Sequence, residues 1–218
     1  MSLWIKICAN TSLADAIVAA EAGADAVGFV FAPSPRRVTA EQVAAIVPRL
    51  PSEIEKIGVF VDATLDEIAG TAEAAGLTGV QLHSDVTAEE TAKLRARLGT
   101  RVRILRVVHF EAGAPERAAA AAQDASVDAI LIDSRTATAV GGTGKIYDWA
   151  EARRTLFGAT KEMKLVAAGG LNPENVAEAI AVLHPWGVDV VSGVEVEPGR
   201  KDAAKVRAFI EKARAAQK

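Results

Sequence analysis

Trp4-Ile5-Lys6-Ile7-Cys8-Ala9-Asn10-Thr11 distinguishes between two kinds of α/β architecture, a closed barrel and an open sheet. A short apolar run ends on the only cysteine of the chain, and Ser12 with Asp15 has the spacing of a helix start. An open doubly wound sheet usually carries a glycine-rich dinucleotide loop after its first strand, and Cys8-Ala9-Asn10-Thr11 is not such a loop. The stretch therefore favours a barrel.

Strand-like runs rich in valine and isoleucine recur along the chain, with helical patterns between them. Their apolar residues are successive rather than alternating, which is typical of strands buried on both faces of a parallel sheet. They predict strands at residues 4–8, 26–31, 56–61, 79–83, 102–107, 129–133, 164–168 and 189–192. Eight alternating units in 218 residues predict an α/β protein that forms a single compact (β/α)8 TIM-barrel domain over residues 1–218.

Helix starts are marked by capping signals. Capping-box spacing is found at Ser12/Asp15, Thr39/Gln42, Thr64/Glu67 and Thr87/Glu90. Asn172-Pro173 predicts a helix with an asparagine cap and a proline in its first position, and weaker patterns predict helices at 115–123 and 147–156. A faint repeat, in which a helix ends and a strand opens, occurs at residues 23–27, 76–80, 126–130 and 187–191. The glycines at these positions are expected to end the preceding helix.

Composition narrows the class of protein. Half of the residues are hydrophobic and the net charge is -3, so there is no basic footprint for nucleic acid. No signal peptide and no apolar run of about 18 residues is present, so no membrane contact is expected. One cysteine cannot form an internal disulfide, which fits a reducing cytoplasm. We expect a cytoplasmic protein with a small-molecule ligand, as a monomer or homodimer.

Glycine pairs follow the seventh and eighth predicted strands. Gly169-Gly170 and Ser192-Gly193 lie where (β/α)8 barrels commonly bind phosphate through backbone N–H groups and a helix N-terminus. Taken alone, each pair fits a simple turn equally well. Their occurrence together in these two loops favours a phosphorylated small-molecule substrate.

An acid–base pair is available at the same end of the barrel. Cys8 and Asp133 end the first and sixth predicted strands. A thiol with a free pKa of about 8.5 can act as a base where its thiolate is stabilised, and a shielded carboxyl can act as an acid. Alternatively, Cys8 is buried filler and Asp133 caps a turn. The three histidines, His83, His109 and His184, have no metal-ligand spacing, so we expect no metal.

Seven motifs in order along the chain resemble those of the phosphoribosylanthranilate isomerases of tryptophan biosynthesis. The matching segments are Lys6-Ile7-Cys8, residues 23–31 with Ser34-Pro35-Arg36, Gly58-Val59-Phe60-Val61, Val80-Gln81-Leu82-His83, Asp133-Ser134 with residues 141–145 and Asp148-Trp149, residues 168–171, and residues 192–195 with Pro198-Gly199 and Lys201-Asp202.

The resemblance implies an Amadori rearrangement of N-(5-phosphoribosyl)anthranilate to 1-(o-carboxyphenylamino)-1-deoxyribulose 5-phosphate, without a cofactor. It implies that Asp133 is the general acid, that Cys8 is the general base, and that Arg36 faces the anthranilate carboxylate. The expected substrate-binding residues are completed by Gly142, Gly144, Gly169, Gly170, Ser192 and Gly193.

Four positions depart from the pattern of the family. Ala9, Asp62 and Ser84 replace its usual glycine, asparagine and glycine, and Val191 replaces the first of two serines. Ala9 is a mild change if its φ is ordinary and a costly one if its φ is positive. Asp62 adds negative charge near an anionic substrate unless it faces away or is paired. Val191 leaves Ser192 and backbone N–H groups as phosphate donors.

Two other functions remain open at this point. One is a related phosphosugar enzyme on the same barrel, such as an indole-glycerol-phosphate synthase or a ribulose-phosphate epimerase. The synthase needs a catalytic lysine, and we expect Lys6 to point the same way as Cys8 only if a bulge intervenes. The other is a barrel that binds phosphate without turnover, which the four departures motivate.

Overall fold

Eight parallel strands close into a barrel in the computed structural model, which describes residues 2–134, 147–158 and 163–217. Each strand pairs with the next along the chain, and β1 also pairs with β8. The strands are β1 (Trp4–Ile7), β2 (Ala26–Val30), β3 (Glu55–Phe60), β4 (Gly79–Leu82), β5 (Arg103–His109), β6 (Ala129–Asp133), β7 (Leu165–Ala167) and β8 (Gly187–Val190). The predicted (β/α)8 barrel is therefore confirmed.

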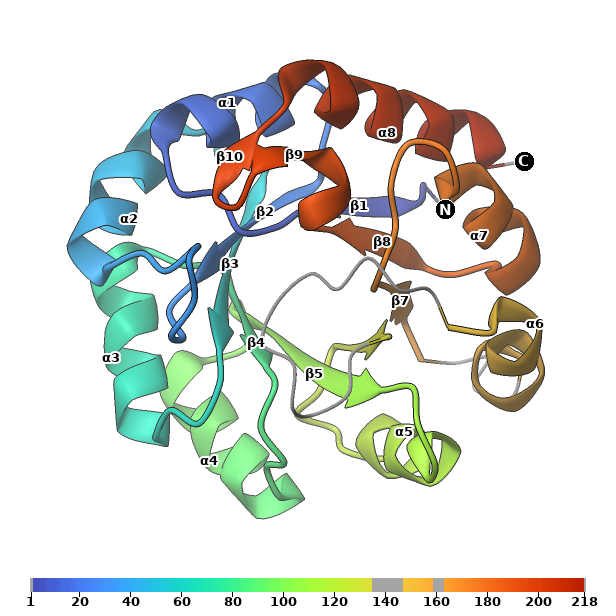
Figure 1. Cartoon of the computed structure of the whole chain (residues 1–218). Coiled ribbons are helices and arrows are strands. Elements are labelled where there is room, and N and C mark those ends of the chain that lie inside the picture. Colours follow the sequence, from blue (N-terminus) through green and yellow to red (C-terminus); the bar gives the residue numbers. More distant parts are fainter. Residues whose placement is uncertain (1, 135–146, 159–162, 218) are drawn as a thin grey trace.

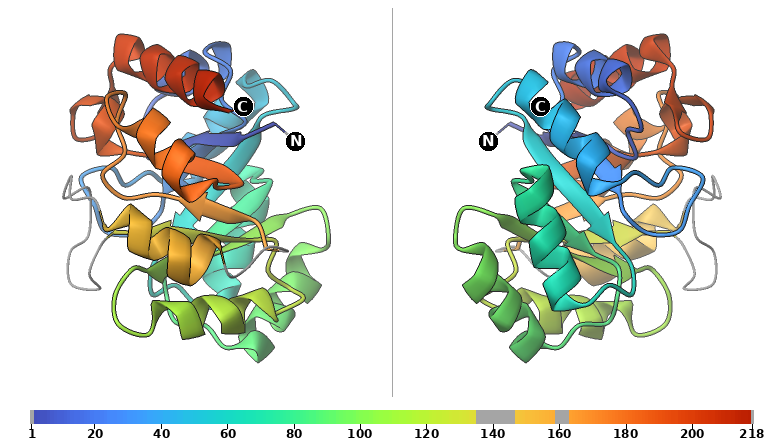
Figure 2. Two further views of the ribbon diagram at one scale, coloured as in Figure 1. Left: turned by 90° about the vertical axis from the view of Figure 1, so that its right-hand side faces the viewer. Right: turned by 90° about the vertical axis from the view of Figure 1, so that its left-hand side faces the viewer.

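Helices surround the barrel on the outside, as Figure 1 and the side views of Figure 2 show. They are α1 (Leu13–Glu21), α2 (Ala40–Ile46), α3 (Leu65–Ala75), α4 (Ala88–Leu98), α5 (Ala114–Ala122), α6 (Trp149–Ala152), α7 (Val176–Leu183) and α8 (Ala203–Ala216). Short additions are the 3-10 turns η1 (Val47–Arg49) and η3 (Ser192–Val194), the π-helix η2 (Arg153–Phe157), and the hairpin of β9 (Glu195–Glu197) and β10 (Arg200–Lys201). Among the helices of the described residues, none is long and apolar enough to cross a membrane.

The eighth strand differs from its prediction. It begins at Gly187, two residues before the predicted start, and Gly187 pairs with Trp4 of β1. A Cβ at Gly187 would lie 2.8 Å from the carbonyl oxygen of Trp4, so the glycine allows close strand contact and does not end α7. His184, with a φ of 48°, takes the left-handed position after that helix. Gly76 does end its helix in this conformation, as predicted.

Three of the predicted capping boxes are confirmed at the starts of α2, α3 and α4. Ser12 caps α1 by accepting the N–H of Asp15. The prediction for Asn172-Pro173 was wrong in detail, because residues 173–175 form a turn and α7 begins at Val176. The Asn172 side chain instead accepts the N–H groups of Glu174 and Asn175 at 2.8 and 3.1 Å, which satisfies the turn and leaves no cap for the helix.

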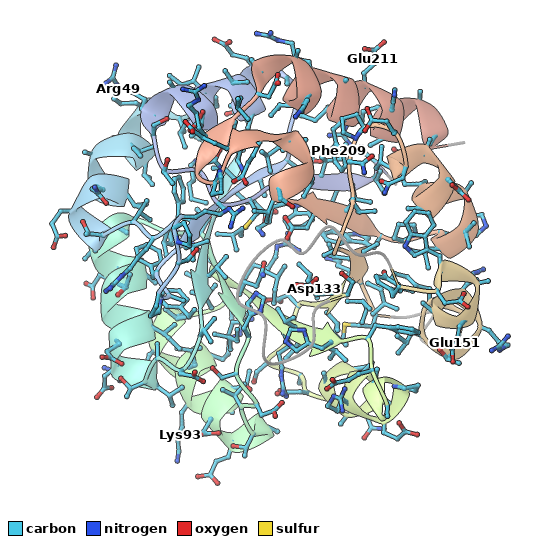
Figure 3. All side chains as sticks on the ribbon, in the orientation of Figure 1. Arg49, Lys93, Asp133, Glu151, Phe209 and Glu211 are labelled. Carbon is cyan, nitrogen blue, oxygen red and sulfur yellow. The ribbon has the colours of Figure 1, made fainter. Side chains whose placement is uncertain are left out.

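Two apolar layers hold the barrel together. The larger lies between the strands and the helices and includes Phe209 of α8, which Figure 3 labels. The smaller fills the inside of the barrel and includes Trp4, Ile57 and Leu131. The exposed side chains labelled in Figure 3, such as Lys93 of α4, point away from both. Above the inner apolar layer the barrel interior becomes polar, and the candidate site begins there.

Candidate active site

A cavity opens at the carboxyl ends of the strands, where catalytic residues of (β/α)8 barrels are found. Its lining includes Cys8 after β1, Arg36 after β2, Asp133 at the end of β6 and Ser192 after β8. The cavity thus brings together the predicted acid and base. Figure 3 shows Asp133 near the middle of the ring of strands.

Cys8 lies at the top of the barrel interior and is only 3% exposed. Its N–H donates to the carbonyl of Val190 at 2.9 Å, which continues the pairing of β1 with β8. Burial raises the pKa of the Cys8 thiol, and the nearby Lys6 ammonium counteracts part of that rise. The structure therefore places the thiol where its protonation depends on neighbouring charges.

Lys6 points into the barrel on the same side as Cys8, without a bulge. The β1–β8 register is continuous from Trp4 to Ile7, and residues i and i+2 of a regular strand share a face. The expectation that a bulge is needed was therefore wrong. Lys6 Nζ lies 3.0 Å from Asp189 Oδ1 and 2.9 Å from Gln81 Oε1. Burial would lower the pKa of Lys6, but Asp189 and Cys8 raise it above its usual value.

Asp133 is buried at the end of β6, beside His109 of β5 in the strand register. The next residue, Ser134, also lines the cavity, and its Oγ has no hydrogen-bond partner within the described part of the chain. Tyr147 is buried and is close enough to Asp133 for the negative charge of that carboxylate to act on its phenol group. Burial, and then the Asp133 carboxylate, raises the pKa of Tyr147 far above its usual value, so this phenol stays protonated.

Arg36 lines the cavity, and one edge of its guanidinium group is bound to Glu195. Its Nε lies 2.9 Å from Glu195 Oε1 and its Nη2 lies 2.7 Å from Glu195 Oε2, a bidentate pair. Glu195 also accepts from the Gly199 N–H and from Lys201 Nζ. The hydrogen bonds that Arg36 donates to Glu195 raise the pKa of Arg36. The β9–β10 hairpin therefore holds the guanidinium at a fixed position in the cavity wall.

The glycine loops after β7 and β8 lie at the cavity as predicted, with one exception. Gly169 and Gly170 have φ values of 81° and 69° and line the cavity together with Ser192. A Cβ at Gly169 would overlap Ser134, and one at Gly193 would overlap the Leu171 carbonyl. Gly193 is not among the described residues that line the cavity. The absence of a side chain at this position allows the close packing of η3 against Leu171. Gly142 and Gly144 lie outside the described residues.

The four departures from the family pattern have distinct local structures. Ala9 has a φ of 61°, in the left-handed region, so the replacement of glycine by alanine at this position costs conformational energy. Asp62 also has a positive φ, but it is exposed and lies outside the cavity lining. Its N–H donates to Ser84 Oγ at 2.8 Å, so two of the departures contact each other. Val191 lines the cavity, and its carbonyl accepts from Lys201 at 3.4 Å.

Five buried polar residues around the cavity were missed by the sequence interpretation as members of the site: Lys6, Gln81, Asp189, Glu195 and Lys201. Strict alternation along residues 4–8 places Lys6 beside Cys8, so this signal was available. The partner of Lys6 is 183 residues away and the partner of Arg36 is 159 residues away, and no local pattern indicates either pair. The residues that the structure describes hold no group of three His, Cys, Asp or Glu side chains placed to bind a metal.

The fold and the cavity define a (β/α)8-barrel enzyme with a thiol and a carboxyl group in one cavity at the carboxyl ends of its strands. The family model for N-(5'phosphoribosyl)anthranilate (PRA) isomerase matches residues 5–212. The chain belongs to this family of isomerases, which act in tryptophan biosynthesis.

Individual relatives agree with this assignment. An N-(5'-phosphoribosyl)anthranilate isomerase of Geobacter sp. (strain M21) is 43% identical over 211 residues, which cover 96% of this chain and 97% of the relative. The crystal structure of the Thermus thermophilus phosphoribosyl anthranilate isomerase has a TM-score of 0.84 at 34% identity and covers 99% of this chain and 100% of that one. A second crystal structure, of a phosphoribosyl anthranilate isomerase in complex with reduced 1-(o-carboxyphenylamino)-1-deoxyribulose 5-phosphate, has a TM-score of 0.80 at 35% identity. It covers 98% of this chain and 99% of that one.

Proposed function

We propose that Cys8 and Asp133 perform the proton transfers by which this isomerase converts N-(5-phosphoribosyl)anthranilate to 1-(o-carboxyphenylamino)-1-deoxyribulose 5-phosphate. The observation that carries the proposal is their position: both line one cavity at the carboxyl ends of the strands. The two residues are far apart in sequence, and only closure of the barrel brings the thiol and the carboxyl group into one cavity.

The two groups act in sequence. Asp133 protonates the ribose ring oxygen, and the ring opens to a Schiff base. The Cys8 thiolate then removes the proton from C2′, and the resulting enolamine tautomerises to the ketone. Each positioned acid or base contributes about 10² to 10⁴-fold to such a rate. The thiol needs to be ionised for its step, and this requirement makes the charges around Cys8 part of the mechanism.

Substrate binding uses the rest of the cavity wall. Arg36 pairs with the anthranilate carboxylate through the edge of its guanidinium that Glu195 leaves open, and its rigid position favours one orientation. Gly169, Gly170 and Ser192, which line the cavity, bind the phosphate through backbone N–H groups and the Ser192 hydroxyl. Gly142 and Gly144, which follow β6 in the sequence outside the described residues, complete the proposed set of substrate-binding residues.

Turnover of the two catalytic variants tests the proposal. Phosphoribosylanthranilate is supplied and the loss of its fluorescence is followed for the wild type, Cys8→Ser and Asp133→Asn. We expect each variant to lose about 10² to 10⁴-fold in kcat. Asp128→Asn is a matched control, because Asp128 lies just before the opposite end of β6 and pairs with Arg95 there. Full turnover by either catalytic variant contradicts the role of that residue.

The phosphate site is tested separately. Inorganic phosphate is expected to inhibit competitively and to raise the melting temperature, because it binds the folded state alone. No competition at high phosphate concentration contradicts the assignment of the glycine loops.

The state of the whole chain is also part of the proposal. Residues 1–218 form one barrel domain that works in the cytoplasm as a monomer or homodimer. The family membership and the reduced single cysteine support the cytoplasmic location. Sedimentation at several concentrations tests the oligomeric state, and a species larger than a dimer contradicts it.

A further inference from the structure

A small polar network fills the barrel interior directly beneath the cavity. Lys6 is fully buried and contacts both Asp189 and Gln81 through its Nζ. Gln81 Nε2 lies 2.8 Å from His83 Nε2, which lines the cavity. A buried ion pair of this kind gives little net stability over well-packed apolar side chains. Stability alone therefore does not explain why these groups replace an apolar layer.

The space beside Gly28 shows how closely Lys6 approaches Cys8. A Cβ at Gly28 of β2 would lie 2.5 Å from Cys8 Sγ and 3.0 Å from Lys6 Cε. The thiol and the end of the lysine side chain thus share the space that the glycine leaves free. The lysine ammonium is held there by Asp189, because Lys6 and Asp189 are register partners on β1 and β8.

We propose that Lys6 is a positioning residue for the known reaction, whose ammonium group beside the Cys8 sulfur favours the ionised form of the thiol against the effect of its burial. The inference rests on the proposed role of Cys8 as the base. Lys6 keeps its proton throughout. The C2′ proton passes to the Cys8 sulfur, and the lysine acts only through its charge and hydrogen bond.

Several other charged or titratable groups face this part of the barrel, and their arrangement leaves Lys6 as the dominant cation. They are Arg36 after β2, His83 after β4, Asp133 of β6, Asp189 of β8, Glu195 of β9 and Lys201 of β10. Arg36 and Lys201 both pair with Glu195 and Lys6 pairs with Asp189, but Lys6 is the cation whose side chain shares the space beside Gly28 with the Cys8 thiol. The pKa of Cys8 is lowered first by Lys6 and to a lesser degree by Lys201, whereas Asp189 raises it.

The single cysteine makes the thiol directly measurable. Alkylation by iodoacetamide reports on Cys8 alone, because the chain has one cysteine. Its rate against pH gives the thiol pKa in the wild type, Lys6→Met, Lys6→Arg and Asp189→Asn, and the pH profile of kcat/KM is measured beside it. Ultraviolet absorbance of the thiolate gives a second titration, since burial and Asp133 raise the pKa of the only tyrosine, Tyr147, far above its usual value.

The two charge removals are expected to act in opposite directions. Loss of an opposite charge at this range raises a thiol pKa by about 1 unit or more, so Lys6→Met alkylates about tenfold more slowly below that pKa. The acid limb of kcat/KM moves to higher pH with it. Asp189→Asn should lower the thiol pKa and move the acid limb of kcat/KM to lower pH. Lys6→Arg keeps the positive charge, so its thiol pKa and its acid limb should stay near those of the wild type.

Two results overturn the proposal: an unchanged thiol pKa in folded Lys6→Met, or shifts of the same sign in Lys6→Met and Asp189→Asn. If Lys6→Met does not fold, Asp189→Asn decides, and a rise or no change in its thiol pKa overturns the proposal. The role of Cys8 fails differently. Turnover by Cys8→Ser contradicts that role, whereas the alkylation shifts are measured without turnover.

Discussion

Ala9 occupies a backbone conformation that favours glycine, directly beside the candidate base. Its φ of 61° lies in the left-handed region, which costs a non-glycine residue about 1 to 2 kcal/mol. The alanine methyl group is fully buried, and its burial offsets up to about 0.8 kcal/mol of this strain. The residue is therefore a local strain that the surrounding structure tolerates, and the intact positions of Cys8 and Asp133 show that it leaves the site assembled.

Ala9→Gly is expected to change the free energy of unfolding by less than about 0.5 kcal/mol, because relief of strain balances the lost methyl burial and the greater entropy of the unfolded chain. The matched control is Ala74→Gly on the exposed face of α3, which should cost about 1 kcal/mol. Urea unfolding measures both. Equal losses in the two variants contradict the strain at Ala9.

Gly28 is the residue on which the space around the thiol depends. Gly28→Ala should lower kcat at least about tenfold, because the new Cβ lies 2.5 Å from Cys8 Sγ and displaces it. Gly58→Ala is the matched control, since its Cβ meets a Leu77 methyl at the same 2.5 Å and touches no catalytic group. Both variants should lose stability, but only the first should lose activity per folded molecule. Equal activity in the two contradicts the close packing of the thiol.

At the scale of single elements, the capping boxes tie helix stability to pH. Backbone N–H donation from Thr87 lowers the pKa of Glu90 at the start of α4. A lowered folded-state pKa means that the stabilisation is present above the unfolded value of about 4.3 and is lost as pH falls through the folded value. Gln42 fills the same position in the box of α2 without a charge.

Glu90→Gln should therefore remove part of the pH dependence of unfolding. The wild type is expected to be more stable than Glu90→Gln at neutral pH, and this difference should vanish in acid. Gln42→Glu should add a dependence of the same sign. Urea unfolding from neutral to acidic pH measures both, and a difference between wild type and Glu90→Gln that is independent of pH contradicts the assignment.

Elements with local signals were predictable, and elements set by distant contacts were not. Thr64 and Glu67 are three residues apart and contain the whole capping box, so the sequence shows it. The start of β8 depends on contact between Gly187 and Trp4, which only barrel closure creates. The site follows the same rule. Cys8 and Asp133 became candidates because each was predicted to end a strand, and the family resemblance supplied their roles, whereas the Arg36–Glu195 pair joins residues that the sequence does not relate.

At the scale of the whole molecule, the two ends of the barrel differ: one end holds the cavity and the other is closed by packed side chains. The carboxyl ends of the strands form the cavity, and the opposite end is closed by Trp4 stacked on Trp186 at 5.3 Å between ring centroids. Arg103 and Lys164 lie over the Trp186 ring. None of these four residues lines the cavity, so the stacked pair contributes to stability rather than to chemistry.

Trp4→Ala is expected to cost about 3 to 5 kcal/mol of unfolding free energy, because it removes a buried ring and leaves a cavity. Its kcat per folded molecule should stay within about twofold of the wild type, since the change lies at the opposite end of the barrel from Cys8 and Asp133. Urea unfolding and the fluorescence assay measure the two effects. A large loss of kcat in the folded fraction contradicts the separation of the two ends.

The Lys6–Asp189 pair joins the first strand of the barrel to the last. Without β8 paired to β1, this lysine lacks the carboxylate that holds it, so the surroundings of Cys8 depend on closure of the ring. Ring closure is a contact between segments far apart in sequence, and such contacts form late and slowly. The reactivity of the single thiol thus reports on whether the first and last strands of the barrel have joined.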